Sequence, residues 1–143
     1  MSFVTVASLI EGCGSSGNPA GPSGGGGTNV PALATINASA AGGTVTVSNV
    51  SGTALASVGS AALVKAGSNS ILVTRAAQDS FTAVTAICTH EQCEVTGFQS
   101  GAFVCPCHGS RYNTSGAVVQ GPATRPLALF NTQFTNNVLT ITV

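Results

Sequence analysis

The chain has 143 residues, a length that fits one domain with a modest core. Four Lys and Arg residues balance four Asp and Glu residues, so no basic stripe exists to neutralise phosphates, and nucleic acid is excluded as a partner. No run of eighteen apolar residues occurs, so we expect no membrane-spanning helix.

Residues 1–29 are predicted to form an apolar leader followed by a Gly-, Ser- and Pro-rich tether. The leader ends at Cys13 in a stretch that resembles a bacterial lipobox, so a lipid on Cys13 is one hypothesis for membrane association. The alternatives are a free cysteine or a misassigned start, because the leader lacks Lys and Arg and because Glu11 is unusual there. Mass spectrometry of the native protein distinguishes them.

Alternating apolar and polar residues predict β-strands at 44–47, 70–74 and 81–87. Turn-forming residues at 66–69 and 77–80 favour an antiparallel meander. An Asn-Asn turn precedes a further strand at 138–143, and residues 54–62 are too rich in small side chains to assign a register. No amphipathic helix is evident, so the chain is predicted to be all-β.

The segment from about 85 to 126 is rich in loops, with short strand-like pieces at 94–98 and 102–104. It contains every candidate ligand. We therefore expect a single domain over 30–143 in which an antiparallel β sandwich or barrel carries this segment as an inserted cluster-binding subdomain.

Two Cys/His pairs predict one metal centre: Cys88 with His90 and, after fourteen intervening residues, Cys105 with His108. Two thiolates on one iron and two imidazoles on the other make the ligand set of a Rieske [2Fe–2S] cluster. Zinc also accepts two cysteines and two histidines, but zinc-binding knuckles usually space their cysteines Cys-x₂-Cys. Iron–sulfur is therefore favoured, and a colourless protein would indicate zinc.

Cys93 and Cys107 lie in the same two loops as the ligand pairs. A disulfide between these cysteines could tie the loops together, and such a bond indicates an oxidising, extracytoplasmic compartment. The periplasm or the cell surface is therefore the expected location.

The two motifs resemble the cluster-binding boxes of the Rieske family, most closely its high-potential branch, which has a disulfide and occurs in cytochrome bc complexes and arsenite oxidase. The motifs read Cys88-Thr89-His90-Glu91-Gln92-Cys93 and Cys105-Pro106-Cys107-His108-Gly109-Ser110. The resemblance implies the Rieske fold. It also implies that Cys88 and Cys105 bind one iron, that His90 and His108 bind the other, and that Cys93 pairs with Cys107.

The same resemblance implies three further roles. Ser110 would donate a hydrogen bond to a bridging sulfide and Tyr112 to the sulfur of Cys88, and both bonds would raise the reduction potential. An ordinary turn serine and a packed tyrosine are the alternatives. Gly121 and Pro122 would belong to a proline loop that covers the cluster, although alone they indicate only a turn.

The ligand set also bears on function. The oxidised core has a charge of 2+, so two thiolates give a neutral cluster and four thiolates give one with a charge of 2−. The neutral cluster accepts an electron more readily. Rieske centres accordingly reach about −150 to +300 mV, against about −400 mV for plant-type ferredoxins. One-electron transfer is therefore the predicted function, and the polypeptide is not expected to catalyse a reaction by itself.

The predicted protein is a tethered carrier or a small redox subunit of an extracytoplasmic assembly. Its partners would be redox proteins such as cytochrome c, or a quinol-oxidising membrane complex. The alternatives are the Rieske subunit of a quinol-oxidising bc-type complex and that of an arsenite-oxidase-like molybdoenzyme. Glu91 counts against quinol, since quinol-oxidising members of the family usually carry a small apolar residue, often Leu, at that position.

Overall fold

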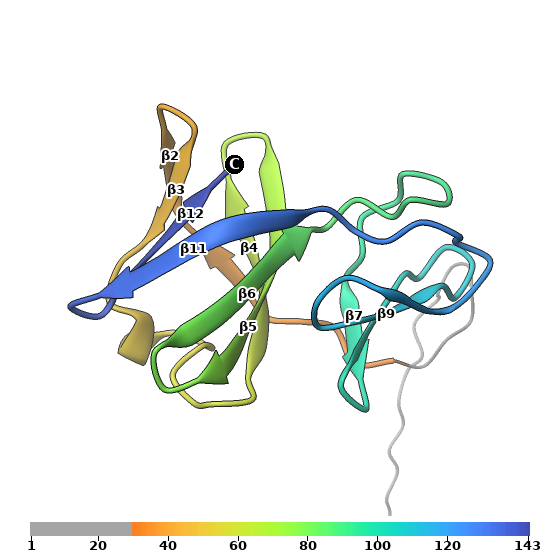
Figure 1. Ribbon diagram of the computed structural model, residues 1–143, viewed down its shortest axis with the longest axis horizontal. Coiled ribbons are helices and arrows are strands. Elements are labelled where there is room, and N and C mark those ends of the chain that lie inside the picture. The colour runs from red at the N-terminus through yellow and green to blue at the C-terminus, as the bar shows by residue number, and fades with distance from the viewer. Residues whose placement is uncertain (1–29) are drawn as a thin grey trace, which may run out of the picture.

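The computed structural model describes residues 30–143, so Cys13, the leader and the tether lie outside the described residues (Figure 1). Apart from one 3₁₀ turn, the regular elements of this part of the chain are all β-strands, and loops connect them. The elements are β1 Thr35–Asn37, β2 Ser39–Ala41, β3 Thr44–Val47, η1 Val50–Gly52, β4 Ala61–Ala66, β5 Asn69–Ala77, β6 Ser80–Thr85, β7 Gly97–Gln99, β8 Ala102–Val104, β9 Arg111–Asn113, β10 Val118–Gln120, β11 Leu129–Thr135 and β12 Val138–Thr142.

Eight strands form a barrel-like sheet in the order β1-β4-β5-β6-β11-β12-β3-β2. The strands at its two ends, β1 and β2, are consecutive in the chain, so the sheet curls until it nearly closes. All neighbours are antiparallel except β1 and β4, which run parallel. The all-β fold with its antiparallel framework is confirmed, and the pairing of β1 with β4 adds one parallel neighbour to it.

The expected turns at 66–69 and 77–80 and the antiparallel pairing of β5 with β6 are confirmed, but the meander begins with β4, and the predicted strand β3 pairs instead with β12 and β2. Strands are also confirmed at β3, β8 and β12. Two expected strands are shorter than predicted. The strand expected to reach residue 87 ends at Thr85. Within 94–98, strand structure begins only at Gly97, and Glu94 forms no more than an isolated bridge with Ile87. Six strands were not predicted, namely β1, β2, β4, β9, β10 and β11.

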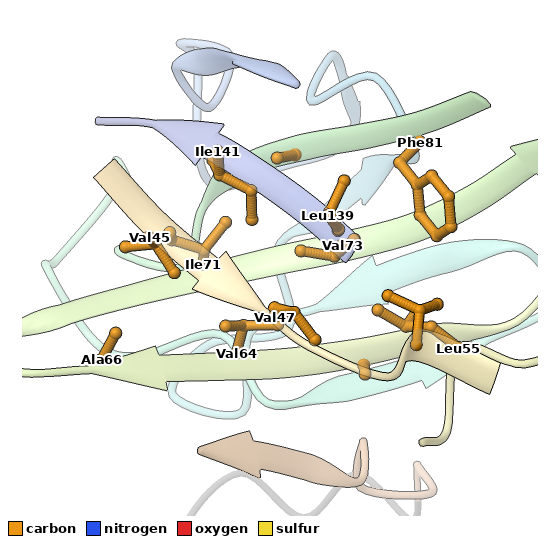
Figure 2. Close-up of a cluster of buried hydrophobic side chains, with 13 residues drawn as sticks. Val45, Val47, Leu55, Val64, Ala66, Ile71, Val73, Phe81, Leu139 and Ile141 are labelled. Carbon is orange, nitrogen blue, oxygen red and sulfur yellow. The ribbon is translucent and has the colours of Figure 1, made fainter. Parts of the chain in front are cut away.

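Aliphatic side chains fill the interior of the barrel. Ile71 and Val73 point inward from β5, and Leu139 and Ile141 meet them from β12, as Figure 2 shows. Because successive residues of a strand face opposite sides, every second residue reaches this core. The remaining members of the cluster are Val45, Val47, Val50, Leu55, Ala62, Val64, Ala66, Phe81 and Ala83.

The opposite face of the meander is buried as well. Leu63, Leu72 and Val84 belong to a second apolar cluster that also contains Phe103 and Tyr112 of the smaller sheet. A strand buried on both faces has a nearly continuous apolar sequence, as 61–64 and 71–73 do. The three meander strands thus form a wall shared by the barrel and the smaller sheet.

The smaller sheet has four strands in the order β10-β9-β8-β7 and lies beside the barrel (Figure 1). The loops of this sheet and the loop after β6 gather on one side of the molecule. From residue 30 onward, no helix has the length and apolar character needed to cross a membrane.

Candidate metal centre

The two ligand loops share one backbone pattern. The N–H of Gln92 donates to the carbonyl of Cys88, and the N–H of Gly109 donates to the carbonyl of Cys105, both at 2.9 Å. The backbone N–H of the first cysteine of each loop donates to the carbonyl five residues later. These bonds join Cys88 to Cys93 at 2.7 Å and Cys105 to Ser110 at 2.8 Å. Gln92 and Gly109 both have a positive φ, 56° and 81°. Each box is therefore a closed turn that presents its cysteine and histidine side chains together.

A disulfide between Cys93 and Cys107 joins the two loops, with Cα atoms 6.5 Å apart. This pairing confirms the expected bond. The other two cysteines of residues 30–143, Cys88 and Cys105, are free and buried. Cys105 Sγ lies within 4.8 Å of both disulfide sulfurs, so the sulfur atoms are concentrated at the base of the loops.

The two histidines lie at the outer end of the same loops. The rings of His90 and His108 have their centroids 5.0 Å apart and are almost perpendicular, at 86°. Both side chains are exposed, and the Glu91 carboxylate lies beside His108. The site thus has buried thiols on the inside and accessible imidazoles on the outside, so the two kinds of candidate ligand lie at opposite ends of the loops.

Tyr112 of β9 contacts the first loop, and Thr89 of that loop contacts the segment that follows β10. Its hydroxyl lies 3.2 Å from Cys88 Sγ and 3.1 Å from the hydroxyl of Thr89. Thr89 Oγ1 donates its proton to the carbonyl of Arg125 at 2.7 Å, so it can only accept from Tyr112. When Cys88 is a thiolate it also can only accept, and the Tyr112 proton is then available to its sulfur.

Ser110 is completely buried, and its Oγ accepts a hydrogen bond from the backbone N–H of Ala123 at 3.0 Å. Within residues 30–143 the hydroxyl proton of Ser110 has no acceptor. A buried donor without an acceptor is costly, so this hydroxyl fits a nearby anionic sulfur. Gly121 and Pro122 themselves are exposed, and Ala123 is the residue of that loop that packs into the site.

The two thiols have pKa values displaced in opposite directions. Burial alone would raise the pKa of Cys88, but hydrogen bonds from Tyr112, from the backbone of His90 and Glu91 and from Cys105 outweigh burial and lower it. Burial raises the pKa of Cys105, and the neighbouring Cys88 raises it further. Burial and Cys88 also raise the pKa of Tyr112. The hydrogen bonds at Cys88 thus favour its thiolate, which is the form that binds iron.

The family comparison agrees with this geometry. The Rieske [2Fe-2S] domain family matches residues 45–131, which is more than half of the chain. The chain belongs to the Rieske family. Its cofactor is accordingly a Rieske [2Fe–2S] cluster, and the zinc alternative is not supported. The Cys93–Cys107 disulfide agrees with the high-potential branch of this family.

Curated relatives of the Rieske domain include iron-sulfur subunits of the cytochrome b6-f complex. The subunit of Prochlorococcus marinus (strain MIT 9303) is 54% identical over 56 residues, 38% of this chain and 31% of the relative. That of Synechococcus sp. (strain CC9605) is 52% identical over the same length. The chain thus aligns with about a third of the length of these relatives.

Solved structures show the same Rieske fold. A plasma membrane Rieske protein of Synechocystis PCC 6803 is 26% identical, with a TM-score of 0.50 over 71% of this chain and 87% of that one. The ferredoxin of carbazole 1,9a-dioxygenase from Nocardioides aromaticivorans IC177 is 20% identical, with a TM-score of 0.56 over 70% of this chain and 97% of that one. The latter likeness concerns the fold alone.

Two contributors to the site were not predicted from the sequence. Thr89 connects Tyr112 to the Arg125 carbonyl, and the N–H of Ala123 holds the Ser110 hydroxyl. A hydroxyl directly between two candidate ligands was a usable signal for Thr89. The N–H of Ala123 carries no signal in the sequence, because every residue except proline has one.

Proposed function

We propose that the protein transfers single electrons through its Rieske cluster, with Cys88 and Cys105 as ligands of one iron and His90 and His108 as ligands of the other. The observation that carries this assignment is the pair of matching loops. Each places one free cysteine inward and one histidine outward, and the disulfide joins them.

The cluster, when bound, supplies a site that accepts and releases one electron. The chain holds Cys88 and Cys105 away from water, and its disulfide fixes the distance between the loops. The Tyr112 hydroxyl lies beside Cys88 Sγ, and the bond from Ala123 leaves the Ser110 hydroxyl proton for a sulfur of the cluster. Hydrogen bonds of this kind stabilise the more negative, reduced state. The exposed imidazoles form the side of the site that a redox partner can contact.

The disulfide supports an extracytoplasmic location, since such bonds persist in oxidising compartments. We propose a carrier or small redox subunit there, with residues 1–29 as its tether and Cys13 as a possible lipid attachment point. A role in a quinol-oxidising membrane complex is the second candidate, because the curated relatives are named as subunits of the cytochrome b6-f complex.

Optical and redox spectroscopy test the proposal. We expect a coloured protein, a paramagnetic reduced state and a potential in the upper part of the range of about −150 to +300 mV. Cys88→Ser and His108→Ala variants should lose the colour but keep the β-sheet circular dichroism. A colourless protein that binds zinc, or a potential near about −400 mV, would contradict the assignment.

Copurification and mass spectrometry distinguish the cellular roles. A tethered carrier should be recovered without a stoichiometric partner and, if anchored, with a lipid mass on Cys13. Stable association with a cytochrome-containing membrane complex would instead support the second candidate.

A further inference from the structure

Glu91 places a carboxylate beside the exposed histidines. It follows His90 directly, and its Oε1 lies 3.7 Å from Nδ1 of His108. About half of each side chain is exposed, 52% for Glu91 and 49% for His108. The separation is longer than a hydrogen bond, and within residues 30–143 no donor forms one with this carboxylate. The carboxylate is therefore free to meet a docking partner.

The remaining carboxylates of residues 30–143 lie elsewhere. Glu94 pairs with Lys65 at 2.8 Å. Asp79 lies in the turn between β5 and β6, at the end of those strands away from the ligand loops (Figure 1). Glu91 is thus the one carboxylate of the described chain that faces both imidazoles.

None of the cations of residues 30–143 forms an ion pair with Glu91. Arg75 is buried, and Arg111 donates to Gln99. Arg125 lines a hollow of about 270 Å³ with Thr89 and Gln92 of the first ligand loop, and its carbonyl accepts from Thr89, but neither histidine lines that hollow. On the surface around His90 and His108, which we call the histidine tip, Glu91 is therefore the one charged side chain of residues 30–143 found within ion-pair distance of an imidazole.

We infer that Glu91 is a specificity-determining residue that selects a protein redox partner with a Lys or Arg side chain facing the histidine tip. The inference rests on the proposed function. The Glu91 charge lies within a few ångströms of the histidine rings, well inside the Debye length of about 8 Å at physiological salt. It therefore attracts a partner of opposite charge to the histidine tip. An apolar docking pocket would instead have to strip water from the carboxylate without compensation.

Oxidation of the reduced holoprotein by two small probes of opposite charge tests the inference. Tris-phenanthroline cobalt(III) and ferricyanide each take one electron from the cluster, becoming cobalt(II) and ferrocyanide, and no proton is transferred. Glu91→Gln also alters the driving force, but that change affects both rates in the same direction. The ratio of the cationic to the anionic rate therefore isolates the electrostatic contribution.

We expect the ratio to fall roughly tenfold in Glu91→Gln at an ionic strength of about 0.01 M, and less at about 0.15 M. Glu91→Lys should lower it by about the square of that factor. Asp79→Asn makes the same change in net charge far from the tip and should leave the ratio within about twofold. Each variant must first show the cluster absorption of the parent protein.

Two results separate the possible failures. If the parent protein is oxidised by both probes and Glu91→Gln leaves their ratio within twofold of the parent value, the role of Glu91 is overturned while the electron-transfer proposal stands. If neither probe oxidises the parent protein, the proposed function itself fails.

Discussion

The hydroxyl of Tyr112 has one proton and two neighbouring acceptors, Cys88 Sγ and Thr89 Oγ1. Tyr112→Phe removes that proton. If the lost bond favours the reduced cluster by about 1 kcal/mol, the potential should fall by roughly 40 mV, since 59 mV corresponds to tenfold, or 1.4 kcal/mol, for one electron. A potentiometric titration of the two proteins measures the shift.

Thr89→Val is the matched control for this prediction. It removes the competing acceptor and leaves the Tyr112 proton to the sulfur of Cys88, so the potential should not fall. A Tyr112→Phe protein with the parent potential would show that this hydroxyl is only a packing group.

Ser110 was predicted from its place in the second motif, and the structure adds a reason why its position is fixed. The N–H of Ala123 donates to its oxygen, which leaves the hydroxyl proton for a further acceptor. Roles of this kind are visible in a sequence when the residue stands at a fixed offset inside a motif. They are invisible when the contributor is a backbone group.

At the scale of elements, the two ligand loops differ in how they meet the same backbone requirement. The fifth residue has a positive φ in both, but it is a glycine in one loop and Gln92 in the other. A side chain costs about 1–2 kcal/mol in that conformation, whereas glycine adopts it freely.

The two positions should therefore respond in opposite directions. Gly109→Ala should lower the free energy of unfolding by roughly 1 kcal/mol, for conformational reasons alone, because a Cβ there meets no atom within 4 Å. Gln92→Gly should be neutral or stabilising by up to about 1 kcal/mol. Urea denaturation measures both, and destabilisation by both substitutions would contradict the equivalence of the loops.

One ion pair joins the barrel to the first ligand loop. Glu94 accepts from Lys65 of β4 and from Ser70 of β5, both at 2.8 Å. The hydrogen bond from Lys65 is the largest cause of a lowered pKa of Glu94, and the Ser70 bond and the charge of Lys65 add to it against partial burial.

A carboxyl with a lowered folded-state pKa stabilises the fold above its unfolded-state pKa and loses that contribution as the pH falls through the folded-state value. We expect less than about 1 kcal/mol, since both partners are partly exposed. Glu94→Gln should lose this contribution near neutral pH and make the stability less dependent on pH in the acidic range. Urea titrations of both proteins at several pH values test this, and parallel curves would contradict it.

The predicted elements divide according to how local their signals are. β3 and β12 alternate clearly and were predicted, whereas β4 was not. Its residues 61–64 are buried on both faces, and this removes the alternation that marks a strand. The parallel pairing of β1 with β4 joins Thr35 to Leu63, a contact that no short stretch of sequence encodes.

At the scale of the whole molecule, the barrel supplies a rigid wall on which the smaller sheet and its loops rest. The cysteines lie at the inner end of the loops and the histidines at the outer end, so the two kinds of proposed ligand differ in their exposure to solvent. The domain limits at residues 30 and 143 stay a prediction. The four ligand assignments stay predictions as well, since they rest on the two Cys/His motifs.

Pulsed EPR of the reduced protein labelled with ¹⁵N-histidine tests the ligand assignment most directly. The chain contains only two histidines, so uniform labelling marks His90 and His108 and nothing else. The proposed centre predicts two ¹⁵N couplings to the reduced cluster, one from each histidine. A parent protein that shows one ¹⁵N coupling, or none, would contradict a Rieske cluster held by Cys88, Cys105, His90 and His108.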